Sequence, residues 1–169
     1  GPDDPAVAAS LNNLAVQYCR RSKFDQAEPL LERSLAIHKK TLPPNHPDVA
    51  ISQQSLASCY REQGKYDQAK PLYEGALAIR EKAFGPNDLR VAVTLSDFAW
   101  LYYEQSKYDK AEPLFERALA IQEKVRGEEH PDVAMSLSNL ARLYVAQNKY
   151  DQAELLFKRA LAMFKKTVG

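Results

Sequence analysis

Apolar positions in this chain return with a period of 42 residues. We call a set of positions one period apart a slot, and four slots hold the same residue four times. They are Val7, Val49, Val91 and Val133; Ala15, Ala57, Ala99 and Ala141; Tyr18, Tyr60, Tyr102 and Tyr144; and Asp25, Asp67, Asp109 and Asp151. A fixed period of this size indicates repeated structural units that stack on their neighbours.

Within each period the apolar spacing predicts two helices and no strand. The first, helix A, begins at steps such as His130-Pro131 and runs about 16 residues with apolar side chains at helical spacing. It ends at a turn-forming residue, and these residues are Ser22, Gly64, Ser106 and Asn148. The second, helix B, carries another apolar stripe and ends in lysines, with Gly85, Gly127 and Gly169 as expected C-caps.

The repeated aspartate is expected to be the N-cap of helix B. In three periods a glutamate follows three residues later and predicts a capping box: Asp25/Glu28, Asp109/Glu112 and Asp151/Glu154. A proline comes next in three periods, at Pro29, Pro71 and Pro113. We expect these prolines at the edge of the first helical turn, where proline costs little.

Composition and charge exclude several classes of function. The net charge is +1 with acids and bases interspersed, so no basic surface for nucleic acid is indicated. No apolar run approaches the roughly 18 residues of a membrane span. The chain has no Gly-rich phosphate loop, HExxH, CxxC or nucleophile elbow, so we predict no enzyme activity, no cofactor and no metal. With only Cys19 and Cys59, expected as small buried thiols, a cytoplasmic setting is favoured.

The histidines fit structural roles. His46 and His130 share a slot with Asp4 and Asp88, which predicts a role at the start of helix A. His38 is expected on the surface of helix B. Gly75 interrupts helix B of the second period, and both room for a partner and tolerated drift stay open as explanations.

The helix A pattern Leu-x-x-Leu-Ala-x-x-Tyr resembles the tetratricopeptide repeat; in the first period it is Leu11, Leu14, Ala15 and Tyr18. Segments such as KYDQAEPL, ALAIREK and HPDVA resemble the 42-residue subtype of kinesin light chain and nephrocystin-type proteins. The resemblance covers the whole chain and departs from the pattern at Gln53 and Leu89. It implies an all-α, right-handed superhelical solenoid of four helix-turn-helix units (eight helices). The single array would divide at about residues 3–44, 45–86, 87–128 and 129–169.

The fold does not require a particular residue at positions that vary between the periods. On helix A they form a second face, which the resemblance places on the concave groove. One slot of this face holds Val16, Ser58, Trp100 and Arg142, and another holds Cys19, Arg61, Tyr103 and Val145. Its amides, hydroxyls and aromatic rings suit an extended peptide. The predicted peptide-binding residues are Asn12, Asn13, Gln54, Ser55, Arg61, Arg80, Asp97, Trp100, Tyr103, Ser138, Asn139 and Arg142.

Two interpretations of these residues stay open at this stage. Trp100 is the single tryptophan, and Trp and Tyr are enriched at binding hot spots, so a place in the groove is favoured over packing on a neighbouring helix as core. Asn13 and Asn139 have either a ligand or a local structural role, and Arg61 and Arg142 either meet an acidic peptide or are solvated charges. Trp100→Ala is expected to weaken partner binding with little loss of helicity.

The sequence therefore predicts a non-catalytic, adaptor-like scaffold that binds a protein or peptide partner, with no nucleic acid or membrane as partner. The alternative is a structural or designed repeat array that self-associates through its apolar C-terminal helix. That helix carries Leu155, Leu156, Phe157, Leu161, Met163 and Phe164. An enzymatic role would need a domain that these residues do not contain.

Overall fold

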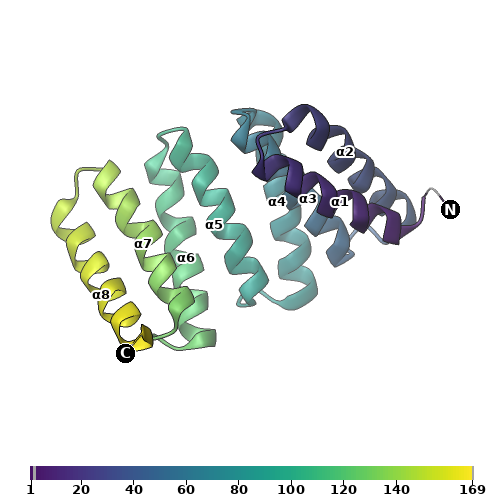
Figure 1. Cartoon of the computed structure of the whole chain (residues 1–169). Coiled ribbons are helices and arrows are strands. Elements are labelled where there is room, and N and C mark those ends of the chain that lie inside the picture. Colours follow the sequence, from purple (N-terminus) through teal and green to yellow (C-terminus); the bar gives the residue numbers. More distant parts are fainter. Residues whose placement is uncertain (2, 169) are drawn as a thin grey trace. The chain divides into compact units, whose positions relative to one another are not determined.

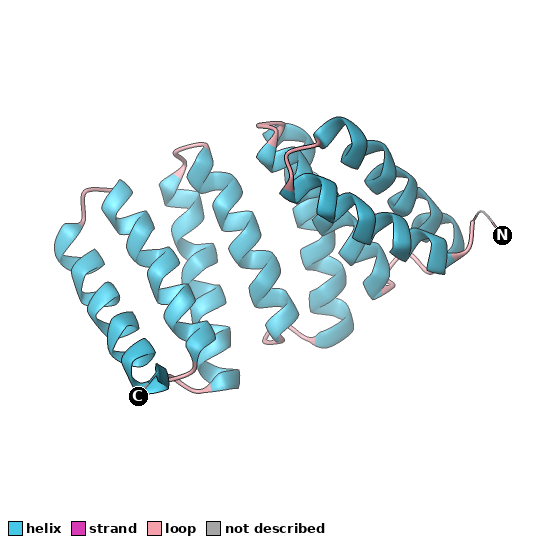
Figure 2. Ribbon diagram, in the orientation of Figure 1, coloured by secondary structure: helices cyan, strands magenta, loops and turns pink. Residues whose placement is uncertain are grey.

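The computed structural model describes residue 1 and residues 3–168, with side chains as far as residue 165. As predicted, the described residues form eight α-helices and no strand (Figure 1, Figure 2). The helices are α1 (Pro5–Arg20), α2 (Phe24–Thr41), α3 (Pro47–Glu62), α4 (Tyr66–Phe84), α5 (Leu89–Glu104), α6 (Tyr108–Arg126), α7 (Pro131–Ala146) and α8 (Tyr150–Val168). They group into two compact halves, residues 1–86 with α1 to α4 and residues 87–169 with α5 to α8. Each half is described by itself.

Helix A begins and ends where the sequence indicated. Asp4, His46, Asp88 and His130 are the N-caps, and each accepts a hydrogen bond from the backbone N–H two residues on, at 2.8, 3.2, 2.8 and 3.1 Å. The predicted structural role of His46 and His130 is confirmed. The turn after each helix contains Ser22, Gly64, Ser106 or Asn148 with φ between 56° and 73°. A left-handed residue cannot continue a right-handed helix, so the chain turns there.

The predicted capping box of helix B is wrong. Helices α2, α4 and α6 begin one residue before the aspartate, and their N-caps are lysines without a side-chain capping bond. An aromatic ring holds this earlier start in α6, where Tyr108 packs on the core and its centroid lies 5.6 Å from that of Tyr103. The aspartate carboxylates instead occupy the first turn, where the helix dipole favours negative charge. Helix α8 likewise has Asp151 in its first turn.

The prolines lie deeper in helix B than expected. Pro29, Pro71 and Pro113 are inside the helix, at its sixth residue, and not at the edge of the first turn. Each lacks the N–H that would bond to the carbonyl four residues earlier. At the other end of helix B, Gly85 and Gly127 are the C-caps, as predicted, with φ of 89° and 88°. Gly169, the third predicted C-cap, lies outside the described residues.

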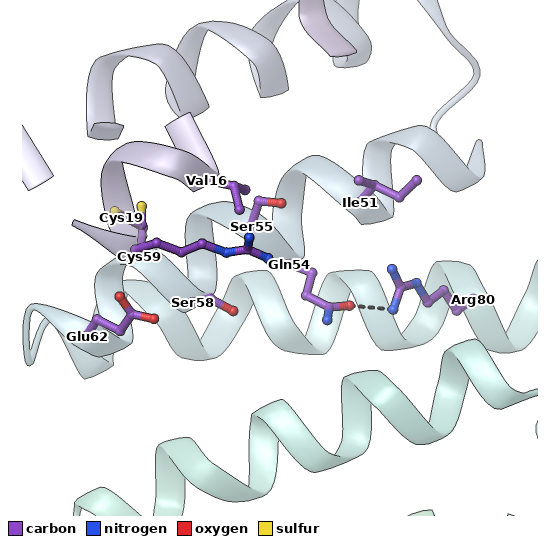
Figure 3. A pocket seen from close by; sticks show the side chains of 10 residues that line it. Val16, Cys19, Ile51, Gln54, Ser55, Ser58, Cys59, Glu62 and Arg80 are labelled. Carbon is purple, nitrogen blue, oxygen red and sulfur yellow. Dashed lines mark hydrogen bonds between the residues drawn. The ribbon is translucent and has the colours of Figure 1, made fainter. Parts of the chain in front are cut away.

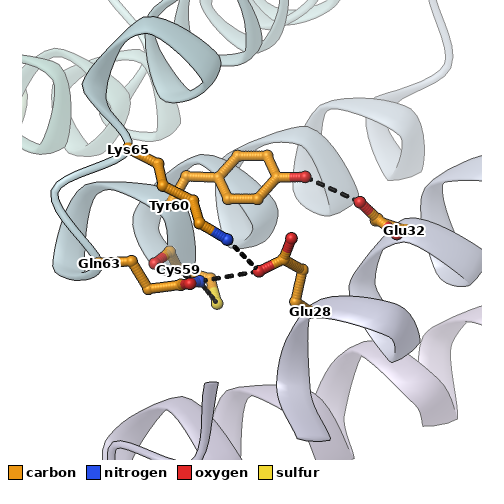
Figure 4. Close-up of polar contacts among 6 residues, drawn as sticks. All are labelled: Glu28, Glu32, Cys59, Tyr60, Gln63 and Lys65. Carbon is orange, nitrogen blue, oxygen red and sulfur yellow. Dashed lines mark hydrogen bonds and ion pairs between the residues drawn. The ribbon is translucent and has the colours of Figure 1, made fainter. Parts of the chain in front are cut away.

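The glutamate of the expected capping box bonds to the next repeat instead. Glu28 of α2 accepts hydrogen bonds from Lys65 Nζ at 2.7 Å and from Gln63 Nε2 at 3.2 Å (Figure 4). In the second half Glu112 accepts from Gln147 Nε2 at 3.0 Å and from Lys149 Nζ at 3.2 Å. We call each Glu–Gln–Lys group a clasp. It ties helix B of one repeat to the turn between helices A and B of the next.

Replacing the carboxylate of a clasp tests its contribution. Burial opposes ionisation of Glu112, but the hydrogen bonds from Gln147 and Lys149 outweigh it and lower the pKa of this carboxyl below its usual value. A lowered folded-state pKa stabilises the fold above the unfolded pKa, and this stability is lost as pH falls through the folded pKa. Glu112→Gln should therefore lower the free energy of unfolding by about 0.2–1 kcal/mol at neutral pH.

Urea unfolding from neutral pH to about pH 3.5 measures this effect. The Glu112→Gln profile should be flatter than that of the wild type, because one carboxyl no longer takes up a proton. Lys149→Met should flatten it in the same way, and the double variant should add little. A profile unchanged by Glu112→Gln would show that the clasp does not contribute to stability.

Close helix packing rests on the alanine slot. Ala15, Ala57, Ala99 and Ala141 have no exposed surface. In the second half one core cluster joins α5, α6, α7 and α8 around Phe115 and Tyr144, and a second joins α7 and α8 around Leu137 and Met163. Small residues at the helix crossings let the larger ones interdigitate.

Two departures from the repeat pattern explain each other. A Cβ at Gly75 would lie 2.8 Å from Nε2 of Gln53, which is closer than real side chains approach. Gln53 occupies the slot of Leu11, Leu95 and Leu137. Gly75 therefore leaves room inside the fold for the side chain of Gln53.

The expectation that His38 lies on the surface is wrong. It is 3% exposed, its Nδ1 lies 2.8 Å from Ser52 Oγ, and that hydroxyl lies 3.1 Å from Ser34 Oγ. The equivalent pair recurs two periods later, where Ser136 donates a hydrogen bond to Gln122. In α2 and in α6 this slot faces the following helix A, and its polar side chain bonds to a serine hydroxyl there.

Candidate functional site

A cavity of about 320 Å3 lies between α1 and α3 in the first half (Figure 3). We call it the α1/α3 pocket. Its lining residues come from α1, α3 and the end of α4, and they are Val16, Cys19, Arg20, Ile51, Gln54, Ser55, Ser58, Cys59, Glu62 and Arg80. Apolar side chains and thiols thus share the wall with hydroxyl, amide and charged groups.

The polar lining is held by neighbouring side chains. Arg80 is only 9% exposed, and its Nη1 donates a hydrogen bond to Oε1 of Gln54. Ser58 Oγ lies 3.0 Å from the hydroxyl of Tyr73, a fully buried residue of α4. A site whose polar groups are already positioned loses little entropy when a ligand binds.

The two thiols of the pocket are protonated. Cys19 and Cys59 are free, and both line the pocket. Burial and then the neighbouring Cys59 thiol raise the pKa of Cys19 to about 12, and burial also raises the pKa of Cys59. Only a deprotonated thiolate acts as a nucleophile or a metal ligand. These protonated thiols therefore serve as small, polarisable side chains that line the pocket. Within the described residues, no group of three or more His, Cys, Asp or Glu could hold a metal ion.

The second half has larger side chains in the equivalent slots. Trp100, Tyr103 and Arg142 stand two periods after Val16, Cys19 and Ser58. The Trp100 ring meets Tyr103 edge-on at 4.9 Å between centroids, and the Arg142 guanidinium lies 4.8 Å from the Trp100 centroid. The same face is thus open in the first half and occupied by an aromatic cluster in the second.

A second cavity, of about 290 Å3, lies between α5 and α7. We call it the α5/α7 pocket. It is lined by Val93, Ser96, Asp97, Gln122, Asp132, Met135, Ser136 and Asn139. Its charged lining groups are two carboxylates, whereas the α1/α3 pocket has two guanidinium groups and one carboxylate. The two pockets therefore favour ligand groups of different charge.

Comparison with protein families identifies the repeat. The tetratricopeptide repeat model matches three overlapping segments, residues 6–81, 54–124 and 104–166. The chain belongs to the tetratricopeptide repeat family. Its fold class is an all-α helical repeat solenoid of four units, as predicted, while the hand of the superhelix stays a prediction. A search of the curated proteins finds no match.

Solved structures confirm the kinesin light chain-like subtype. BtubC (BKLC) from P. vanneervenii is 28% identical with a TM-score of 0.88, covering 98% of this chain and 66% of that one. A putative kinesin light chain of P. anserina with nearly identical TPR-like repeats is 32% identical with a TM-score of 0.84, covering 98% and 78%. A Rap protein complexed with competence and sporulation factor is 18% identical with a TM-score of 0.82, covering 94% and 43%, which shows likeness of fold alone.

Eight of the twelve predicted site residues of this tetratricopeptide chain fall into three groups. Gln54, Ser55 and Arg80 line the α1/α3 pocket, and Asp97 and Asn139 line the α5/α7 pocket. The aromatic cluster unites Trp100, Tyr103 and Arg142.

The remaining predicted residues line neither pocket and do not belong to the aromatic cluster. Asn12 is 7% exposed and its Oδ1 is buried, whereas Asn13 is exposed. Ser138 donates a hydrogen bond to the Ala134 carbonyl of its own helix at 2.9 Å. Arg61 is half-buried, with its Nη2 4.0 Å from Oε1 of Glu62. These contacts of Ser138 and Arg61 are with their own helices, and a role of all four residues in binding stays a prediction.

Trp100 packs on the core, as one of the two open interpretations predicted, and its role in binding stays a prediction. It is half-buried, and its ring meets that of Phe115, a core residue of α6, edge-on at 5.3 Å. Arg142 is exposed and lies over the Trp100 ring. The ring is therefore a packing element whose outer face is shared with a surface cation.

Sequence reasoning missed the residues that keep the α1/α3 pocket open. Val16, Cys19 and Ser58 belong to slots that we had already marked as variable, yet we selected members of those slots for large or hydrogen-bonding side chains. A small side chain contributes to a pocket by the volume it leaves empty. Comparing side-chain size within each variable slot would have found them.

Proposed function

We propose that this protein is a non-catalytic interaction scaffold that binds a peptide segment of a partner protein through the α1/α3 pocket. One observation carries the proposal: Val16, Cys19 and Ser58 leave a cavity of about 320 Å3 where the second half has bulky side chains. The tetratricopeptide fold generally serves as a scaffold for protein interactions, and the Rap protein of this fold occurs in complex with competence and sporulation factor.

The chemistry of the pocket suggests the class of peptide. Ligand pockets typically have volumes of about 300–1,000 Å3, so this cavity suits one large apolar side chain and a short stretch of backbone. Val16, Ile51 and the thiols form the apolar wall. Ser55 and Ser58 offer hydroxyls to the peptide backbone, and the two arginines favour a carboxylate beside the apolar anchor.

Filling the pocket tests this proposal. Peptides would be selected on the whole chain from a random library, and their dissociation constants measured by fluorescence anisotropy. Val16→Trp places in the pocket the residue that the second half has in this slot. It should weaken the selected peptides at least about tenfold, because the anchor side chain loses its volume, a loss of roughly 1.4 kcal/mol or more.

Ala36→Trp is the matched control, since it adds the same side chain at an exposed position of α2. It should leave affinity unchanged. Peptides that bind Val16→Trp and the wild type equally would contradict a role of the α1/α3 pocket. If Trp100→Ala lowered the affinity of such peptides, recognition would lie on the aromatic cluster of the second half.

A further inference from the structure

Helix α8 exposes an apolar stripe that the equivalent helices bury. Phe157 is 39% exposed, whereas Phe115 and Leu31 in the same slot are 2% and 0% exposed. Leu161 is 54% exposed, whereas Leu35 in its slot is 7% exposed. Another member of that slot, Leu119 of α6, packs against the cluster that α7 and α8 form. The stripe of α8 thus has the composition of a helix B face that receives a helix A.

Helix α1 exposes the complementary face. Leu14 is 47% exposed, whereas Leu56 and Leu140 in its slot are both 4% exposed. Leu14 borders a shallow depression together with Val7 and Leu11, whose equivalents in α7 are fully buried. In α7 this face packs on helix B of the preceding repeat, since Leu140 shares a core cluster with Phe115.

We propose that two copies of this chain associate head to tail, with α1 of one copy seated on α8 of the other in the register of α7 on α6. The occupant of the α8 stripe is then a second copy. The contact repeats one the fold already makes twice, between α2 and α3 and between α6 and α7. It uses Val7, Leu11 and Leu14 of α1, and not the α1/α3 pocket, so it stands apart from the proposed function.

Charge complementarity supports this register. Glu154 of α8 occupies the slot of the clasp residues Glu28 and Glu112. In the second copy, Lys23 and Arg21 follow α1. Lys23 stands in the slot of the clasp lysines, and Arg21 stands in the slot of the clasp glutamines. Glu154 would therefore meet two cations of the second copy, where an internal clasp has one cation and one amide.

The groups around Glu154 leave its carboxylate able to pair with these cations of the second copy. Its Oε1 lies 2.5 Å from Lys158 Nζ on the same exposed helix face, and surface pairs of this kind contribute little to stability. Lys158 stands in the slot of Glu32, which accepts a hydrogen bond from Tyr60 at 2.9 Å. In the assembly Tyr18 of the second copy takes the place of Tyr60, and its hydroxyl can accept a hydrogen bond from Lys158.

Sedimentation velocity of the 169-residue chain at about 1–500 µM tests the proposal. The interface is heterologous, so each added copy leaves one α1 and one α8 open, and the mass should rise beyond the dimer. Leu161→Glu and Leu14→Glu should each remain monomeric, with unchanged helicity in circular dichroism. A wild type that stays monomeric over the whole range overturns the proposal.

Leu155→Glu is the matched control on α8. Leu155 is 69% exposed, more than Leu161, but its slot holds Pro29 and Pro113, which stay exposed where the repeats stack. This variant should associate like the wild type. Loss of association in Leu155→Glu would mean unspecific stickiness of α8, and would overturn the proposed register.

Mixing the two blocked variants tests whether the chains associate head to tail. The Leu14→Glu chain keeps an intact α8 and the Leu161→Glu chain keeps an intact α1, so an equimolar mixture should form a dimer and nothing larger. A dimer of Leu14→Glu alone would indicate α8 packing on α8 and overturn the proposal. Adding Glu154→Lys to the Leu14→Glu chain should weaken the mixed dimer about five- to tenfold, and Lys23→Glu on the other chain should recover part of the loss.

Discussion

Phe115→Ala is expected to lower the free energy of unfolding by about 3–5 kcal/mol. Phe115 is 2% exposed and packs among Ala99, Ala111 and Ala141, and the ring of Trp100 meets it edge-on at 5.3 Å. Alanines at the helix crossings cannot move into the cavity that the lost ring would leave, so the structure relaxes little. Chemical unfolding followed by circular dichroism measures the change.

Phe157→Ala provides the control for this prediction. Phe157 has the same side chain in the same slot one period later, but it is 39% exposed. Measured at concentrations where the chain is monomeric, its loss should cost less than half as much, because much of the ring already contacts water. Equal costs for the two substitutions would mean that burial does not govern this slot.

Gly127→Ala is expected to cost about 1–3 kcal/mol through the backbone alone. Gly127 is the C-cap of α6 with φ 88° and ψ 150°, a region that residues with a Cβ hardly adopt. A Cβ built at this position meets no atom within 4 Å, so steric contact with neighbours adds nothing. Urea unfolding of the variant at neutral pH measures the loss.

Gly64→Asn should behave differently although Gly64 also has a positive φ, of 73°. Its slot holds Ser22, Ser106 and Asn148, which adopt φ between 56° and 61° without glycine. The left-handed helical region tolerates asparagine, so the expected change lies within about 1 kcal/mol. If Gly127→Ala were as neutral as Gly64→Asn, the C-cap conformation of α6 would not require glycine.

Helix boundaries were predictable because their determinants act over a few residues. Pro5, Pro47 and Pro131 open helix A, and the left-handed residues that follow close it, as the pattern indicated. Proline restricts its own φ and a left-handed residue ends the hydrogen-bond ladder whatever lies elsewhere in the fold. The predicted start of helix B was one residue too late and its predicted N-cap was wrong, because the helix begins at the aromatic residue before the aspartate.

Side-chain partners were less predictable than helices. Glu28 and Glu112 have the spacing of a capping box, yet they bond to residues of the following repeat. His38 has the composition of a surface position, yet its ring is buried beside Ser52. One short motif is compatible with several partners, and the residue that lies nearest in space decides among them.

Periodicity alone yields the number of repeats, the helix types and the faces that vary, since backbone preferences and apolar spacing are encoded within a few adjacent positions. The place of the pockets followed only from the packed helices. The volume between α1 and α3 depends on side chains from several helices at once, and Val16, Cys19 and Ser58 matter there by being small. Empty space is a property of the assembled neighbours, and no single segment of the chain carries it.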